Sequence, residues 1–165
     1  MAMDNTYRAS IWLFFATALY FVMNGAQLWE TALMVPAWTA APPESLFFFK
    51  GPHGLDFKYF WMIVHSVHDL VLILAIAFNW RLRKRRNIML MLFAVHIAMR
   101  VWTLTYFAPT LMSFMALDVQ PGTDVALLEK ATTWKLLNYL RVAIYVMVNF
   151  GYTVLLIRAV KPREE

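Results

Sequence analysis

Polar and ionisable side chains recur at helical spacing inside the long apolar stretches of this 165-residue chain. An ionisable group inside a segment that crosses a bilayer costs about 2.5–3.5 kcal/mol, so it normally faces other helices and marks a functional site. The residues suited to catalysis are His65, His68, Asp69 and His96. The residues suited to binding a substrate are Asn24, Gln27, Glu30, Trp61, Arg100, Thr103, Trp134, Asn138 and Arg141.

Two histidine-containing segments bring acid–base groups onto single helical faces. In the sequence HSVHD, His65 precedes both His68 and Asp69 by about one helical turn and can share a face with either. His96 and Arg100 are also one turn apart. The other stripes are Asn24, Gln27, Glu30 and Thr31 in the first apolar stretch, Thr103 and Phe107 beyond Arg100, and Trp134, Asn138, Arg141, Tyr145 and Tyr152 in the last.

The polar residues of the four predicted helices also lie at a similar depth in the membrane. Successive spanning helices run in opposite directions, so one level is reached late in one helix and early in the next. At a rise of about 1.5 Å per residue, the stripes fall between the midplane and the outer interface, with His96 nearest the middle. The charges of Glu30 and Asp69 balance those of Arg100 and Arg141. The sequence therefore predicts one polar pocket inside the membrane.

The composition supports a bilayer environment. Hydrophobic residues make up 61% of the chain and charged residues 15%, and the mean hydropathy is +0.55, whereas soluble domains are nearer half apolar and a quarter charged. The net charge of +5 comes from short basic blocks beside apolar runs, so topology explains it better than a nucleic-acid partner does. The absence of cysteine excludes disulfides, iron–sulfur clusters and thiol chemistry.

We predict an all-α fold, a bundle of four transmembrane helices that forms a single domain over residues 1–165. A spanning helix needs about 20 mostly apolar residues, and four segments meet this requirement. The predicted spans are residues 9–35, 57–80, 87–109 and 133–160. Pro109 is expected to kink or end the third helix, and a short amphipathic helix is expected over residues 124–132. The first span is expected to be retained rather than cleaved as a signal peptide.

The loops indicate an orientation. Residues 81–86 carry five basic side chains, and such a loop stays in the cytoplasm by the positive-inside rule. With four spans both termini are then cytoplasmic, in agreement with Arg8, Arg158, Lys161 and Arg163 near the ends. The first outer loop contains prolines, glycines and aromatic residues and is expected to be structured. These features place the pocket in the extracytoplasmic half of an inner or plasma membrane.

Several chemistries fit the pocket. Polar groups in a bundle can also serve only as hydrogen-bonding contacts between helices, which is the alternative for any one residue. A metal could be held by His65, His68, His96, Asp69 and Glu30, but the nearby arginines disfavour a cation. A haem could take one of the histidines as axial ligand. We predict a site without metal or cofactor, with metal or haem on His65, His68 or His96 as the open alternative.

One stretch resembles a known family. The sequence TLTYFAPTLMSFMAL, followed by Trp134, Asn138 and Arg141, is similar to the small four-helix membrane proteins that include the anthrone oxygenases of polyketide pathways. Members of that family show a Pro-Thr or Pro-Thr-Asn element and then a Trp, an Asn and an Arg at this spacing. Here Pro109-Thr110 is followed by leucine rather than asparagine. The part that carries these motifs is under a third of the chain.

The resemblance implies an enzyme that oxidises an electron-rich ring carbon with dioxygen and gives a quinone, without an evident cofactor. The chemistry of the residues assigns roles under that hypothesis. His65 or His68 would remove a proton from the substrate, and Asp69 would orient the histidine. The substrate anion would be held by Arg100, Arg141 and Asn138, and its ring would stack on Trp134 and Trp61.

A non-catalytic protein is the competing class. Such a subunit would hold a quinone, a lipid or a haem in the same pocket. A transporter is the third possibility, although the chain is short and lacks repeats, so a second copy would have to supply the other half. The expected partners are thus a hydrophobic small molecule and the lipid bilayer, with a homo-oligomer as a further possibility and no nucleic acid.

Overall fold

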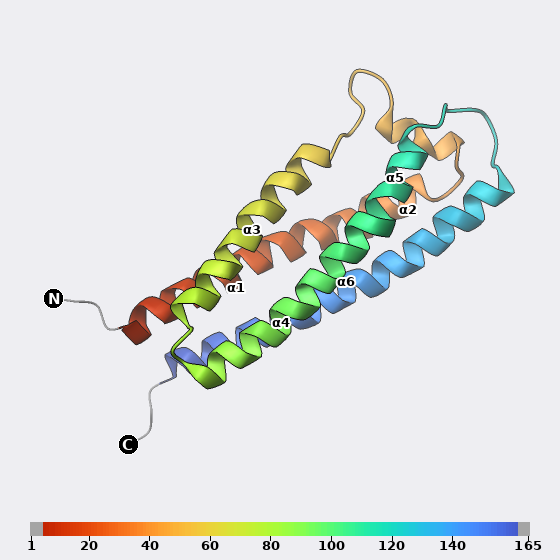
Figure 1. Cartoon of the computed structure of the whole chain (residues 1–165). Helices are drawn as coiled ribbons and strands as arrows, with labels where there is room; N and C mark the ends of the chain where they lie inside the picture. Colours follow the sequence, from red (N-terminus) through yellow and green to blue (C-terminus); the bar gives the residue numbers. More distant parts are fainter. Residues whose placement is uncertain (1–4, 162–165) are drawn as a thin grey trace.

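The computed structural model describes residues 5–161 and is helical, with no strand in that part of the chain. Arg163 lies outside the described residues. The chain forms four rods (Figure 1). Their elements are α1 (Asn5–Trp29), η1 (Glu30–Met34) and α2 (Val35–Trp38) in the first rod, α3 (Lys58–Phe78) in the second, α4 (Arg83–Trp102), η3 (Thr103–Phe107) and α5 (Ala108–Met115) in the third, and α6 (Val125–Val160) in the fourth.

Each rod contains a helix long and apolar enough to cross a membrane. The prediction of an all-α chain with four spanning helices is therefore confirmed, and the chain is a multi-pass membrane protein. Large apolar side chains point outward along the rods, for example Ile63 at 64% and Met147 at 67% exposure. Such faces suit a lipid environment, because the hydrocarbon core of a bilayer offers no hydrogen-bond partners to polar side chains.

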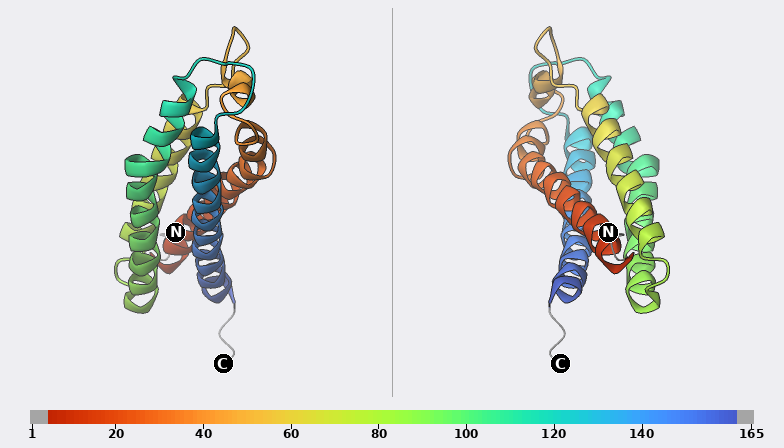
Figure 2. Two further views of the ribbon diagram at one scale, coloured as in Figure 1. Left: turned by 90° about the vertical axis from the view of Figure 1, so that its right-hand side faces the viewer. Right: turned by 90° about the vertical axis from the view of Figure 1, so that its left-hand side faces the viewer.

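Helix α1 is central, packing against α3 and α6, while α4 packs mainly against α6. The start of α1, the end of α6 and the α3–α4 connection lie at one end of the bundle, and the two longer loops lie at the other, called here the loop end (Figure 1). The two turned views show the α3 and α4–α5 rods on one side and the α1 and α6 rods on the other (Figure 2). Between the rods lie two apolar clusters, one toward each end.

Two prolines lie inside helical rods rather than at their ends. The first rod continues past Pro36 to Trp38, and the third continues past Pro109 to Met115. In both rods a five-residue π-helical turn, η1 or η3, ends directly before the residue that precedes the proline. Proline donates no hydrogen bond and its ring crowds the carbonyl four residues earlier, so the wider turn lets the helix continue. The helical rods thus extend beyond residues 35 and 109, where the predicted spans end.

The fourth rod is a single helix of 36 residues. It begins at Asp124, whose carboxylate Oδ1 accepts a hydrogen bond from the Leu127 backbone N–H at 2.9 Å, as a good N-cap does. Residues 125–132, predicted to form a short amphipathic helix, are helical, but they are the first turns of this longer helix. No proline or glycine interrupts residues 123–150, so the helix that starts at Asp124 propagates directly into the span.

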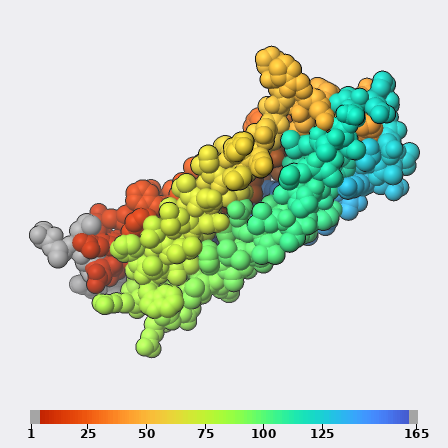
Figure 3. All heavy atoms as spheres, turned by 45° about the horizontal axis from the view of Figure 1, so that its top comes forward, coloured from red at the N-terminus to blue at the C-terminus, as the bar shows by residue number. Residues whose placement is uncertain are grey.

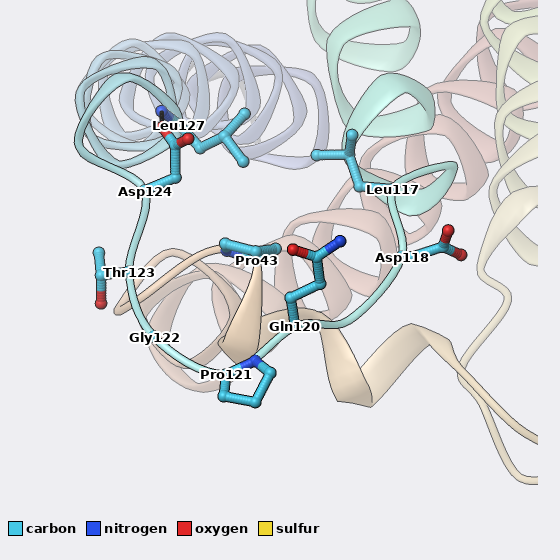
Figure 4. A pocket seen from close by; sticks show the side chains of 9 residues that line it. All are labelled: Pro43, Leu117, Asp118, Gln120, Pro121, Gly122, Thr123, Asp124 and Leu127. Atoms are coloured by element: carbon cyan, nitrogen blue, oxygen red, sulfur yellow. Dashed lines mark hydrogen bonds between the residues drawn. The ribbon is translucent and has the colours of Figure 1, made fainter.

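The loop end is held together by contacts between its two connections. Residues 39–57 include η2 (Glu44–Phe49), whose Leu46 is buried among Trp38, Phe114 and Trp134. The Gly122 N–H donates to a Glu44 carboxylate oxygen at 3.0 Å, and the Asp124 N–H to the Pro42 carbonyl at 3.0 Å. A hollow of about 490 Å³ lies between Pro43 and residues 117–127 (Figure 4). Its polar side chains are exposed, so it is a gap between packed loops.

Asn79 joins three elements at the opposite end of the bundle. It is fully buried, and its amide nitrogen donates to the Ala9 carbonyl at 2.9 Å and to the Ala75 carbonyl at 2.8 Å. Its oxygen accepts from Arg85 at 3.0 Å. We expect Asn79→Ala to lower the free energy of unfolding by about 1–3 kcal/mol, because buried partners lose their hydrogen bonds. Thermal unfolding in detergent would show this, and Asn87→Ala, at an exposed position, should leave the transition unchanged.

Candidate functional site

A cavity of about 480 Å³ lies in the loop half of the bundle, between all four rods. Its walls are mainly apolar, with a small set of polar and aromatic groups. Those predicted from the sequence are Gln27, Glu30, Trp61, His65, Arg100, Thr103, Trp134 and Arg141. The volume is within the range of about 300–1,000 Å³ usual for small-molecule sites, and so is the balance of apolar wall and few polar groups.

The two π-helical turns form part of this wall. Glu30 is the first residue of η1, while Thr103 and Phe107 are the first and last residues of η3. A π-helical turn shifts the following side chains around the helix axis and is frequent at functional sites. The two π-helical turns therefore help to determine which side chains reach the cavity.

Arg141 is held in place from several directions. Its guanidinium donates to Thr103 Oγ1 at 3.1 Å and to Asn138 Oδ1 at 2.6 Å, and lies 4.3 Å from the centre of the Phe107 ring. Asn138, which is buried, donates in turn to Thr31 Oγ1 at 3.1 Å. Glu30 acts electrostatically on the same guanidinium. A cation fixed in this way keeps its position when a ligand binds, which suits recognition of an anionic oxygen.

Beside the cavity, four side chains form a continuous polar chain. The Tyr20 hydroxyl lies 2.7 Å from His96 Nδ1, and His96 Nε2 lies 2.8 Å from Asp69 Oδ1. Arg100 Nε is 3.6 Å from the other oxygen of Asp69. Because Arg100 also lines the cavity, it connects the polar chain to the space where a ligand would bind.

His65 is the histidine that lines the cavity. Its ring stacks on Trp61, with centroids 5.1 Å apart and planes 24° apart. His68 and His96 lie deeper, with 1% and 0% exposure. Asp69 pairs with His96 rather than with His65 or His68, so the carboxylate expected to orient a base acts on the histidine of the neighbouring helix.

Most of the predicted residues thus fall into two groups. Eight residues line the cavity, and His68, Asp69 and His96 lie together beside it. The two remaining residues do not line the cavity. Asn138 accepts a hydrogen bond from Arg141, and Asn24 donates one to the Tyr145 carbonyl at 3.3 Å.

Comparisons with protein families, with curated proteins and with solved structures find no match to this chain. The chemistry of the site therefore has to be argued from its own residues.

Tyr20, which forms one end of the polar chain through its contact with His96, was not identified from the sequence. A tyrosine within an apolar run is most often a packing or interfacial residue, and nothing in its immediate neighbours indicates otherwise. The signal was its spacing, since Tyr20 precedes Asn24 by four residues and Gln27 by seven, the positions of one helical face. Extending that stripe backwards by one turn would have included it.

Proposed function

We propose that this protein is a membrane-embedded oxidoreductase that oxidises a hydrophobic aromatic compound bearing an acidic hydroxyl group. The observation that carries the proposal is the cavity itself, in which His65, Arg100 and Arg141 are gathered inside apolar and aromatic walls. An apolar wall favours binding of the ring system of such a compound, and the two arginine cations favour binding of its ionised oxygen. The resemblance to anthrone oxygenases supports the same class of substrate.

The position of the cavity supports access from the bilayer. Met62, Leu104 and Met112 line it and are 55%, 65% and 58% exposed, respectively. Helices α3 and α4 make few contacts with each other. In the space-filling view the yellow α3 rod and the green α4–α5 rod diverge toward the loop end, and deeper atoms are visible between them (Figure 3). A hydrophobic compound dissolved in the bilayer would enter the cavity sideways between these rods.

The residues suggest how the reaction would proceed. His65 removes a proton from the substrate, and Arg100 and Arg141 stabilise the resulting anion. Trp61 and Trp134 contact the flat ring system. Dioxygen then converts the activated ring CH2 group to a carbonyl group, and one molecule of water is released. Of the two histidines considered as base, His65 is favoured because it lines the cavity.

The distribution of basic residues supports an orientation. Arg8, residues 81–86 and Arg158 lie toward the end of the bundle where the chain begins and finishes, as their positions at the ends of the rods require. By the positive-inside rule this end faces the cytoplasm. Both termini are then cytoplasmic, and the cavity lies in the extracytoplasmic half of an inner or plasma membrane.

Binding and oxygen uptake test the proposal together. A hydroxyanthrone added to the purified protein in detergent should quench tryptophan fluorescence saturably, because Trp61 and Trp134 line the cavity. Oxygen consumption should exceed that of the Ala108→Trp variant, in which a large side chain fills the cavity that Ala108 lines. Saturable quenching without oxygen uptake would instead indicate a non-catalytic binding protein. A lack of quenching would overturn the proposed substrate class.

A further inference from the structure

His68 occupies an unusual environment for a histidine. It is 1% exposed, and neither of its ring nitrogens has a hydrogen-bond partner among the described residues. The ring lies edge-on to Tyr20, with centroids 4.4 Å apart, and to His96, with centroids 5.3 Å apart. A buried polar group without a partner destabilises the fold, and an unseen water or ion is a common explanation.

The neighbours of His68 supply a matching set of ligand atoms. One atom each from His68, Asp69 and His96 lie within 4.8 Å of one another. His96 Nε2 and Asp69 Oδ1 are 2.8 Å apart. Adjacent ligands in an octahedral site with bonds of about 2.1 Å are about 3 Å apart, so this pair, which is hydrogen-bonded in the structure, is close to the spacing that a metal ion would need. Two histidines and one carboxylate form the set that binds divalent iron and related metals while leaving coordination positions open.

The surrounding groups orient these ligands. The Tyr20 hydroxyl bonds His96 Nδ1 at 2.7 Å, which directs Nε2 toward Asp69. Arg100 lies beside Asp69 Oδ2, 3.6 Å away, and leaves Oδ1 to face His96. Metal-binding histidines and carboxylates usually have such partners on their far sides. The positive charge of Arg100 opposes a cation, and the negative charge of Asp69, whose Oδ2 lies 3.6 Å from Arg100 Nε, offsets that repulsion.

We infer that His68, Asp69 and His96 together bind one divalent first-row transition metal ion beside the cavity. This departs from the expectation of a metal-free site. The expectation placed all polar residues around one pocket, whereas the structure separates these three from His65 and Glu30. Water is the competing occupant, because one bridging water molecule would also satisfy His68.

Cobalt(II) is a suitable probe, because its visible absorption reports nitrogen and oxygen coordination. We expect tag-free, chelator-treated protein in detergent to bind about one equivalent of cobalt(II) and to develop visible d–d bands. His68→Ala and Asp69→Asn should reduce bound cobalt to background while the protein stays monodisperse. His53→Ala, in the loop between η2 and α3, and His65→Ala, one turn before His68, should bind as the wild type does.

Tyr20→Phe gives a graded test that does not remove a ligand. It keeps the ring but loses the hydroxyl that orients His96, so the affinity for cobalt(II) should fall by about 10–100-fold with the stoichiometry unchanged. Wild-type protein that binds no cobalt in stoichiometric amount would overturn the inference and assign water to His68. Loss of binding in His53→Ala but not in His68→Ala would also overturn it. Ligand quenching of tryptophan fluorescence is measured separately, so failure of the metal site and failure of the proposed function are distinguishable.

Discussion

Replacing His65 by glutamine should lower the rate of substrate oxidation by about 10²–10⁴-fold, the usual contribution of a general base. His65 lines the cavity and stacks on Trp61, and glutamine keeps a polar side chain of similar length that cannot take up the proton. Binding should change little, since the ring systems of Trp61 and Trp134 and the two arginines remain. Oxygen consumption gives the rate, and quenching of tryptophan fluorescence gives the dissociation constant.

His53→Gln is the matched control for this experiment. His53 lies in the loop between η2 and α3 and is exposed, so its replacement should leave both the rate and the affinity unchanged. An unimpaired rate in His65→Gln would show that another group removes the proton. Equal loss of binding and rate in His65→Gln would instead assign His65 to holding the ligand.

Arg141→Met should weaken ligand binding by about 100-fold. The guanidinium is fixed by Thr103, Asn138 and the Phe107 ring, so it meets an anionic oxygen without reorganising, and losing one partner of such a buried charge pair costs about 2–5 kcal/mol. Asn138 and Thr103 also lose a partner, so the unfolding temperature should fall as well. Fluorescence titration measures the first effect and thermal unfolding in detergent the second.

Two further variants separate charge from geometry. Arg141→Lys keeps the charge but lacks the planar set of donors, so binding should be intermediate between the wild type and Arg141→Met. Arg158→Met removes a cation from an exposed position on the same helix and should bind as the wild type does. Wild-type affinity in Arg141→Met would mean that the ligand anion is held elsewhere.

The sequence was sufficient for the number and type of helices. An apolar run of about 20 residues has few alternatives to a spanning helix, and the chain contains four such runs. The ends of the helices were harder to predict. Pro109 was expected to kink or end the third helix, and the first span was expected to stop at residue 35, because the sequence does not reveal that a π-helical turn will accommodate each proline. The common feature can be recognised afterwards, since η1 and η3 begin six residues before a proline in both rods.

The sequence predicts which face of each helix carries the polar residues, but not how neighbouring helices are rotated relative to one another. Helical spacing predicted that His65 and Asp69 can share one face of a helix, and in the structure His65 is buried and Asp69 half-buried. It did not reveal that Asp69 bonds His96 on a different helix. Pairing across helices depends on crossing angles and on side-chain rotamers, neither of which follows from the period of a single helix. The division into a cavity and a separate histidine–aspartate cluster therefore required the structure.

The unequal lengths of the rods determine where the cavity lies with respect to the lipid. The 36 residues of α6 extend for about 54 Å, whereas the 21 residues of α3 extend for about 32 Å and only just cross a hydrocarbon layer of about 30 Å. Lys58 and His65 both line the cavity, so it extends inward from the end of α3 by only about 10 Å. If α3 crosses the hydrocarbon layer along its whole length, the cavity lies just beneath the lipid headgroups, within reach of both the hydrocarbon phase and water. We then expect the partition coefficients of the proposed substrate and product to decide from which phase each enters or leaves the cavity.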